Sequence, residues 1–292
     1  DSVFNQTYKD WEILFWDNGS TDTSAKIAKS YGEKVRYFHS KKTYSLGKAR
    51  NLCMAKSKAE YIAFLDCDDL WLPQKLEKQI PLFEKDPEVA LVFSDAIYFN
   101  ESGNLCQIYL KFKPSRGKIF KELFRKYFLC MASTVIQRSA IKNIDWFDER
   151  IKLFEDACFF LRLAYKFKAD YCDEPLVKYR VRPDSGTIMD FGDLPYERDL
   201  ALKTFTDEFP NFKKEHEQDI RIFQSKTNAQ RAINEWNNNN PKKARKILRN
   251  TNYKSLLIYA LFFVTFLPTT TFKTFFILNY KIKSWLNWYN FE

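Results

Sequence analysis

Three carboxylates stand within the short run Asp66-Cys67-Asp68-Asp69, directly after the apolar segment Tyr61–Leu65. Carboxylates this close together repel one another unless a cation, hydrogen-bond donors or water compensates their charge. Hard oxygen ligands select Mg²⁺ or Mn²⁺ over zinc. The run therefore predicts a divalent-metal site at the end of a strand. The structural alternative is a solvated loop in which Asp69 caps the following helix.

A second polar loop, Asp17-Asn18-Gly19-Ser20-Thr21-Asp22, follows the apolar segment Ile13–Trp16. A carboxylate such as Asp17 at the end of a strand can accept hydrogen bonds from the N–H of a nucleobase or from ribose hydroxyls. Alternatively, Asn18-Gly19 forms a turn and one of the three residues after it caps the next helix. The loop is therefore a candidate nucleotide contact.

These two loops must be positioned by the elements before them. Over residues 1–180, short β-rich runs alternate with helical patterns, which indicates an α/β layered domain. In open sheets of this kind, ligands bind beyond the carboxyl ends of the strands, where both polar loops fall. The predicted strands are Glu12–Trp16, Val35–Phe38, Tyr61–Leu65 and Val89–Phe93, and the predicted helices are Thr23–Tyr31, Leu46–Lys58 and Pro73–Lys85, the last with Pro73 in its first turn.

The composition is that of a globular protein: 292 residues with 45% hydrophobic and 29% charged side chains exclude a disordered or collagenous chain. The six cysteines lie far apart, without the paired spacing of a zinc site or a dense disulfide framework, which favours a reducing cytosol. The chain begins at Asp1, with neither an initiator Met nor a signal peptide. We therefore expect it to begin inside a longer gene product.

Several motifs occur together, and as a set they are highly specific. Over residues 4–187 their order and spacing closely resemble the family 2 glycosyltransferases of the GT-A fold. The resemblance implies an α/β, Rossmann-like domain that transfers sugars from nucleoside diphosphates. The motifs are Gln6-Thr7-Tyr8, the loop from Asp17 to Asp22, Gly47-Lys48-Ala49-Arg50-Asn51, Leu65-Asp66-Cys67-Asp68-Asp69, Trp71-Leu72-Pro73, Phe147-Asp148-Glu149, Phe154-Glu155-Asp156, Glu174-Pro175-Leu176-Val177 and Tyr179-Arg180.

Carried onto these positions, the resemblance implies a nucleotide-sugar site, most often for a UDP-sugar, with Mg²⁺ or Mn²⁺ bound to the diphosphate. The structural alternative for Glu155-Asp156 is that the helix dipole favours acids in a first turn whether or not they catalyse. The implied roles are contact with the base for Asp17 and Arg50, contact with the ribose for Asp66, metal binding for Asp68 together with Asp66, contact with the diphosphate for Arg180 and Arg182, and general-base catalysis for Asp156 beside Glu155.

Two features depart from the family. The strand that normally precedes Gln6-Thr7-Tyr8 is absent, so we expect the sheet to be interrupted between Glu12–Trp16 and Tyr61–Leu65. Arg182 stands where many relatives carry histidine, and its forked donors suit a phosphate rather than a metal. The alternative to an active enzyme is therefore a catalytically inactive, membrane-bound assembly module.

The last quarter of the chain is basic and aromatic. Residues 220–292 hold 12 basic and 2 acidic side chains, which accounts for the formal net charge of +10. A helix over the apolar run Leu256–Leu267 would be roughly 18 Å long, short of the roughly 30 Å of a bilayer core. Together with the basic cluster Lys242–Arg249 and a second apolar run, Phe272–Tyr280, this predicts attachment to an anionic membrane surface.

The sequence thus predicts a catalytic domain over 1–187, a helical extension over 188–250 and a membrane-associating tail over 251–292. The predicted protein is an inverting, metal-dependent glycosyltransferase in the cytoplasm, peripheral on the inner face of the cytoplasmic membrane, that acts on a hydroxyl of a surface glycan or a lipid-linked saccharide. Alternatively, the apolar runs of the tail pack on the catalytic domain and its lysines form a solvated face. A nucleic-acid partner is not expected, because no recognisable binding motif accompanies the basic tail. Predicted helices in the extension and tail are Tyr196–Phe209, Gln218–Asn237 and one that begins at Pro241.

Overall fold

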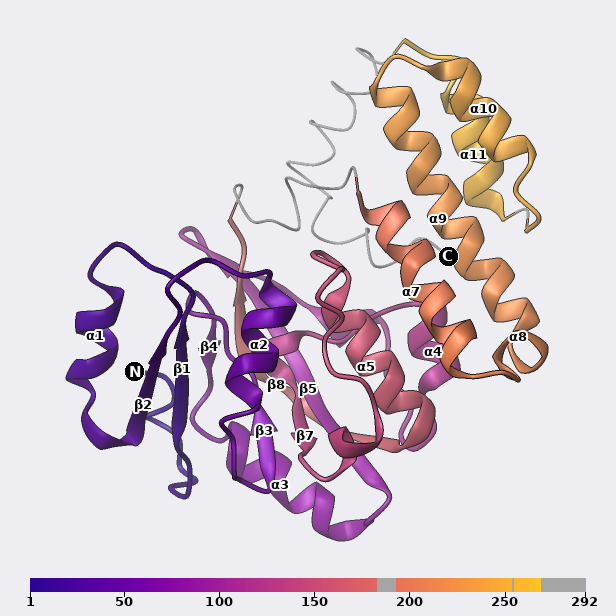
Figure 1. The fold of residues 1–292 in the computed structure, drawn as a ribbon. Helices are drawn as coiled ribbons and strands as arrows, with labels where there is room; N and C mark the ends of the chain where they lie inside the picture. Colours follow the sequence, from indigo (N-terminus) through magenta and orange to yellow (C-terminus); the bar gives the residue numbers. More distant parts are fainter. Residues whose placement is uncertain (183–192, 254, 269–292) are drawn as a thin grey trace. The chain divides into compact units, whose positions relative to one another are not determined.

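The computed structural model describes residues 1–182, 193–253 and 255–268 (Figure 1). The chain divides into two compact units. Unit 1 comprises residues 1–120 and 129–181, and unit 2 comprises residues 121–128 and the described residues from 182 onward. All six cysteines are free thiols.

Unit 1 is an α/β unit, as the alternation of patterns predicts. Its strands are β1 (Ile13–Asp17), β2 (Val35–His39), β3 (Tyr61–Ala63), β4 (Leu70–Trp71), β5 (Val89–Asn100), β6 (Gly103–Gln107), β7 (Val135–Gln137) and β8 (Lys168–Arg180). Its α-helices are α1 (Ser24–Ser30), α2 (Leu46–Met54), α3 (Lys75–Lys85) and α5 (Glu155–Lys166), and its 3₁₀ helices are Gly32–Lys34, Ile108–Lys111, Met131–Ser133 and Ala140–Asn143.

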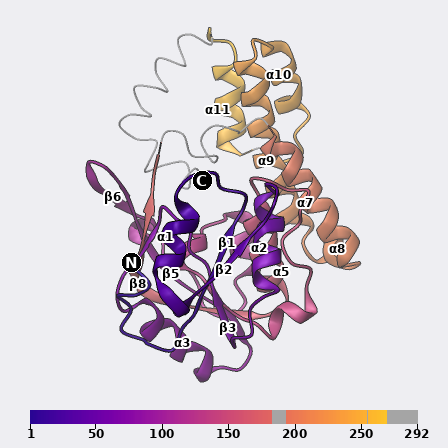
Figure 2. The same cartoon turned by 60° about the vertical axis from the view of Figure 1, so that its left-hand side comes forward.

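The strands form two separate sheets. In the smaller sheet, β1 and β2 are parallel, and α1 packs against both (Figure 2). In the larger sheet the order is β3-β7-β5-β8-β4, with β6 paired to β5. The central strand β5 is parallel to β8 and antiparallel to β7, and its residues from Val89 to Ala96 are all buried or nearly so. The first part of this run, Val89–Phe93, is apolar because both of its faces are covered.

The predicted interruption of the sheet is confirmed for the described residues. No strand ladder joins β1 to β3, which lies at the edge of the larger sheet. Most residues of β1 and all residues of β3 are half-buried rather than buried, so water can reach the unpaired edges. The Cys53 thiol also donates a hydrogen bond to the Leu14 carbonyl, with a sulfur–oxygen distance of 3.4 Å. Solvation reduces the cost of about 1–3 kcal/mol that a dry, unpaired backbone group would carry.

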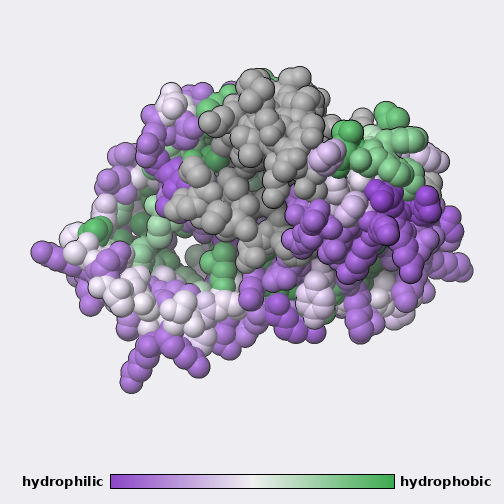
Figure 3. Space-filling model, turned by 90° about the horizontal axis from the view of Figure 1, so that it is seen from above, coloured by the Kyte–Doolittle hydropathy of each residue, from purple (hydrophilic) through white to green (hydrophobic). Residues whose placement is uncertain are grey.

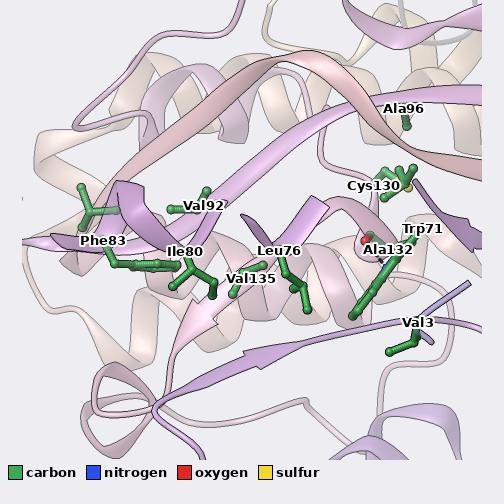
Figure 4. Close-up of a cluster of buried hydrophobic side chains, with 12 residues drawn as sticks. Val3, Trp71, Leu76, Ile80, Phe83, Val92, Ala96, Cys130, Ala132 and Val135 are labelled. Atoms are coloured by element: carbon green, nitrogen blue, oxygen red, sulfur yellow. Dashed lines mark hydrogen bonds between the residues drawn. The ribbon is translucent and has the colours of Figure 1, made fainter. Parts of the chain in front are cut away.

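A core cluster of unit 1 lies between α3 and the larger sheet (Figure 4). On α3, Leu76, Ile80 and Phe83 recur at helical spacing and pack against strand residues such as Val92 and Val135. The segment between β3 and α3 carries the acidic run and the short strand β4.

Several predicted boundaries differ from the observed ones. The strand predicted over Tyr61–Leu65 ends at Ala63, and the helix predicted over Leu46–Lys58 ends at Met54. The prediction that Pro73 lies in the first helical turn is wrong, because α3 begins at Lys75. The physical reason is the side chain of Gln6, whose amide oxygen accepts the Leu76 N–H and whose amide nitrogen donates to the Leu72 carbonyl. These bonds satisfy the start of α3 from outside the helix.

Unit 2 is helical, as predicted for the extension. Its own core contains Ala232 and Trp236 of α9, Leu248 of α10 and Ile258 of α11. Within the described residues, no helix is long and apolar enough to cross a membrane. The predicted run Phe272–Tyr280 lies outside the described residues. The helices are α4 (Phe120–Arg125), whose first residue belongs to unit 1, α7 (Leu194–Glu208), α8 (Phe212–Glu215), α9 (Glu217–Asn237), α10 (Pro241–Arg249) and α11 (Leu256–Val264).

A lysine is buried at the first position of α3. The side chain of Lys75 has no exposed surface, and its ammonium has no hydrogen-bond partner among the described residues. Its nitrogen lies 4.4 Å from the centre of the Trp71 ring. Burial lowers the pKa of Lys75 to about 7.

We predict that Lys75→Met stabilises unit 1 by roughly 1–4 kcal/mol at pH 7, because methionine fills the same space without a buried charge. The folded protein gives up the Lys75 proton at a lower pH than the unfolded chain does. The wild type therefore gains stability as the pH rises from about 7 to about 10, and the advantage of the variant should shrink over this range. Urea denaturation at several pH values measures both effects. Lys78→Met, which removes an exposed ion pair to Glu174, is the control and should change stability little. A less stable Lys75→Met protein at pH 7 would contradict the assignment.

Candidate active site

Asp17 ends β1 with a buried carboxylate, 2% exposed. One oxygen accepts the Ser20 N–H at 2.7 Å, and the other accepts the hydroxyl of Tyr37 on β2. Burial alone would raise the pKa of this carboxyl, but the hydrogen bonds from Tyr37 and Ser20 outweigh it and lower the pKa to about 2. Nδ1 of His39, the residue paired with Asp17 in the parallel register, lies 3.6 Å from the same carboxylate. Asp17 is therefore a fixed anion at the carboxyl end of the smaller sheet.

Hydrogen bonds from side chains hold the loop after Asp17. The side chain of Thr23, the residue before α1, makes no capping hydrogen bond. Both polar atoms of the Asn18 side chain bond to the backbone of Tyr44. Among the three residues proposed as a cap, Asp22 accepts the N–H of Ser24, the first residue of α1, at 2.9 Å. The nucleotide-contact and capping interpretations of this loop are thus compatible, because they use different carboxylates.

The three carboxylates of the acidic run after β3 lie in different environments. Asp69 is buried and accepts the backbone N–H of Arg180 at 2.8 Å. The Arg180 side chain donates through Nε to the Asp68 carbonyl at 2.9 Å, so the end of β8 holds the loop. Burial, with the nearby charges of Asp66 and Asp68, raises the pKa of Asp69 to about 7. The alternative in which Asp69 caps the following helix is wrong, because its partner is β8 rather than α3.

Asp66 and Asp68 are left at the surface of the loop, where both residues are partly exposed. Among the described residues, no group of three or more His, Cys, Asp or Glu side chains could hold a metal ion by itself. Mg²⁺ at nucleotide sites commonly takes one or two protein carboxylates and completes its shell with phosphate and water oxygens. The oxygen donors of Asp66 and Asp68 fit a cation of this kind.

Arg50 of α2 joins the acidic run to the beginning of α5. Its Nη1 lies 2.6 Å from Oε1 of Glu155, and its Nη2 lies 3.2 Å from Oδ1 of Asp66. The side chain of Arg50 is 12% exposed and that of Glu155 is 5% exposed. Burial opposes the charge on Arg50, but Asp66, Glu155 and Asp156 together keep its pKa above the usual value. The guanidinium thus compensates a group of carboxylates drawn from two distant segments.

Other residues of α2 contact the segment directly before α5. The side chain of Asn51 exchanges hydrogen bonds with both backbone groups of Phe147. Lys48 pairs with Glu149 at 2.9 Å. A Cβ atom on Gly47 would lie 3.3 Å from the Asp148 carbonyl oxygen and from Cβ of Phe147, so glycine permits this close approach. The motif around Arg50 is therefore a docking face for the segment before α5.

Glu155 and Asp156 occupy the first turn of α5. Glu155 is committed to Arg50, whereas Asp156 is partly exposed and accepts the Ala157 N–H at 2.6 Å. The helix dipole favours negative charge in this first turn. Arg182 is exposed and belongs to unit 2, so it is not part of the cluster described within unit 1.

Sequence reasoning missed Tyr37 and assigned no role to Asn51 or Phe147. The contact between Tyr37 and Asp17 follows from the parallel pairing of β1 and β2, which the short helix between them could have indicated. The contact of Asn51 with Phe147 has no comparable local signal.

Comparison with known proteins decides the family. Residues 1–145 match the family described as Glycosyl transferase family 2. The first half of this chain belongs to that family. An uncharacterized glycosyltransferase of Methanocaldococcus jannaschii is 31% identical over 190 residues, which are 62% of this chain and 64% of that protein. The chain therefore spans less than two thirds of the length of this relative.

Two further likenesses bear on the family 2 domain. The Escherichia coli protein UDP-Glc:alpha-D-GlcNAc-diphosphoundecaprenol beta-1,3-glucosyltransferase WfgD is 28% identical over 121 residues, which are 41% of this chain and 47% of that protein. Among solved structures, Staphylococcus aureus TarS 1–349 in complex with UDP-GlcNAc has a TM-score of 0.64 at 16% identity, covering 89% of this chain and 78% of that one.

Another solved structure, the mannosyltransferase PcManGT from Pyrobaculum calidifontis with GDP-Man and Mn²⁺, has a TM-score of 0.57 at 16% identity, covering 99% of this chain and 78% of that one. These likenesses confirm the predicted GT-A fold with a helical C-terminal part.

We predict that Arg50→Met destabilises the family 2 domain by roughly 3–5 kcal/mol, because it leaves the buried Glu155 carboxylate uncompensated. Adding Glu155→Gln to that variant should return part of the loss, since no buried charge then lacks a partner. Urea denaturation of the double-mutant cycle should give a coupling of about 1–3 kcal/mol. Lys48→Met, which removes the exposed pair with Glu149, is the control and should cost under about 1 kcal/mol. Strictly additive losses for Arg50 and Glu155 would show that the ion pair does not hold these segments.

Proposed function

We propose that this chain is an inverting, metal-dependent glycosyltransferase that moves a sugar from a nucleoside diphosphate, UDP in the first instance, to a hydroxyl of a surface glycan or lipid-linked saccharide. The observation that carries the proposal is the Arg50 bridge, which brings the acidic run beside the first turn of α5 in a family 2 domain. A loop that would bind a metal ion and a carboxylate that would act as a base would together serve a displacement at the anomeric carbon, and the Arg50 guanidinium joins the two segments that carry them.

The donor would be held by the carboxylates at the strand ends. Asp17, which stays ionised because of its low pKa, would accept hydrogen bonds from the base. Asp66 would face the ribose, and Asp68, with Asp66, would bind Mg²⁺ or Mn²⁺, which would stabilise the charge that develops on the leaving diphosphate. Arg180, whose Nε already bonds to the Asp68 carbonyl, and Arg182 remain candidates for contact with the diphosphate.

Asp156 would act as the general base. It would remove the proton from the acceptor hydroxyl while that oxygen attacks the anomeric carbon, and the bond from this carbon to the diphosphate would break with its electron pair leaving on the diphosphate oxygen. One displacement gives inversion. Glu155 is less suited to this step, because it is buried and paired with Arg50, so we assign it and Arg50 to positioning. Direct contact of Arg50 with the nucleotide base of the donor stays a prediction from the sequence.

The choice of donor and acceptor draws on the relatives. TarS is solved with UDP-GlcNAc, and the name of WfgD specifies a UDP-glucose donor and a diphosphoundecaprenol-linked acceptor. PcManGT is solved with GDP-Man and Mn²⁺, which supports a divalent metal but a different base. We further propose that the chain lies peripherally on the inner face of the cytoplasmic membrane, a place that suits a lipid-linked acceptor.

Asp68→Ala should abolish Mn²⁺-dependent binding of UDP, because the diphosphate would lose the carboxylate that anchors its cation. Isothermal titration of UDP into the protein, with Mn²⁺ and with a chelator, measures this. Asp145→Ala removes an exposed carboxylate outside the proposed site and should bind UDP as the wild type does. If Asp68→Ala kept wild-type, metal-dependent affinity, the assignment of the acidic run would be wrong.

Asp156→Asn should keep UDP affinity while the rate of sugar transfer or donor hydrolysis falls roughly 10²–10⁴-fold, because the amide cannot accept the proton. Release of UDP from a panel of UDP-sugars gives the rate, and titration gives the affinity. Equal losses of rate and affinity would instead indicate that Asp156 belongs to the donor site.

A further inference from the structure

One face of α11 is apolar and open to solvent. Its side chains recur every three or four residues and include Leu256, 80% exposed, and Phe263, 69% exposed. The opposite face carries Ile258, which is buried in the core of unit 2, and Thr265, the residue directly after the helix, is also buried. The exposed face therefore does not serve the described core of unit 2. Its members are Leu256, Tyr259 and Phe263 of α11, and the exposed side chains of Phe266 and Leu267 follow directly after the helix.

Cations from α10 border this apolar face. The Arg245 guanidinium lies 4.3 Å from the centre of the Phe266 ring and donates to the Thr265 carbonyl at 2.7 Å. Arg249 lies 5.3 Å from the centre of the Phe262 ring. Their positions are fixed beside α11, which lowers the entropy lost when they meet an anionic group. At the right-hand side of the view in Figure 3, a hydrophobic patch lies beside a strongly hydrophilic one.

The charge of α10 is of one sign. Its sequence contains five basic residues and no acidic one. Lys242 and Lys246 are exposed, and their helical spacing puts them on the same side as Arg245 and Arg249. Lys243 points elsewhere, since it pairs with Glu235 of α9. An apolar helix face with cations of α10 along one edge complements an anionic, partly apolar surface.

We propose that the α10–α11 surface, meaning the exposed face of α11 with Lys242, Arg245, Lys246 and Arg249 of α10, docks on an anionic lipid bilayer. This proposal rests on the membrane attachment proposed above and assigns it to particular residues. Leu256 and Phe263 enter the boundary between headgroups and acyl chains, while the α10 cations contact lipid phosphates. A helix as short as α11 lies in the plane of the interface, because it is far shorter than the roughly 30 Å bilayer core.

The apolar part is tested by co-sedimentation of the full chain with vesicles of phosphatidylglycerol and phosphatidylcholine. Phe263→Asp should weaken binding roughly tenfold or more, because the aromatic side chain no longer enters the lipid. Tyr196→Asp is a matched control: Tyr196 is also 69% exposed in unit 2, and the same charge is introduced. It should bind nearly as the wild type does.

The cationic part is tested with a second pair of variants. Lys242→Gln with Lys246→Gln should weaken binding to the anionic vesicles roughly thirtyfold at low salt, since each charge near such a surface contributes about a factor of five. Lys213→Gln with Lys214→Gln removes the same charge from α8 and should have little effect. On vesicles of phosphatidylcholine alone, the two double variants should behave alike.

Three results would overturn the proposal: no vesicle binding by the wild type, equal losses for Phe263→Asp and Tyr196→Asp, or a Phe263→Asp protein that loses self-association in light scattering instead of lipid affinity. A marked fall in melting temperature for Phe263→Asp without vesicle binding by the wild type would show that the chain itself covers this face.

Titration with UDP and Mn²⁺ is run on the same preparations. Absent UDP binding with the expected vesicle results would contradict the proposed enzyme and leave the docking surface intact.

Discussion

The buried charge of Arg50 is the constraint on which the site depends. A guanidinium that is largely withdrawn from water must be surrounded by carboxylates, and it takes Glu155 from one segment and Asp66 from another. This requirement fixes how close α2, the acidic run and the beginning of α5 lie. Gly47 and Asn51 serve the same contact, one by leaving room for the segment before α5 and the other by bonding to its backbone.

The carboxylates of the site differ because their surroundings differ. Asp17 receives donors from Tyr37 and Ser20 and remains an anion, whereas burial beside Asp66 and Asp68 raises the pKa of Asp69. Glu155 is neutralised by Arg50, which leaves Asp156, one residue further along the same turn, as the partly exposed acid. Under the proposed function, separate acidic residues are thus available for contact with the nucleotide base, anchoring of the loop, positioning and proton removal.

The features that depend on the order of residues along the chain could be predicted from the sequence. Strand polarity predicted that Asp17 and the acidic run lie at carboxyl ends of strands, and the motif order predicted the family. The interruption between β1 and β3 was also predictable, because the chain offers no strand for that place. The contact between Arg50 and Glu155 was not predictable, because the partners are 105 residues apart in the sequence. Each charge, taken alone, is typical of a surface side chain. The same holds for Asp69, whose partner on β8 appears only once the larger sheet has formed.

We infer that the acidic run, tied to the beginning of α5 by Arg50, forms the donor and metal site together with Asp17. The most direct measurement is X-ray diffraction at the manganese absorption edge from crystals grown with UDP and Mn²⁺. We expect one anomalous peak, from a manganese ion bound to the Asp68 carboxylate and to the diphosphate, with the nucleotide base beside Asp17 and the Arg50 bridge to Glu155 retained. An anomalous peak away from Asp66 and Asp68, or UDP bound elsewhere with these carboxylates unoccupied, would contradict it.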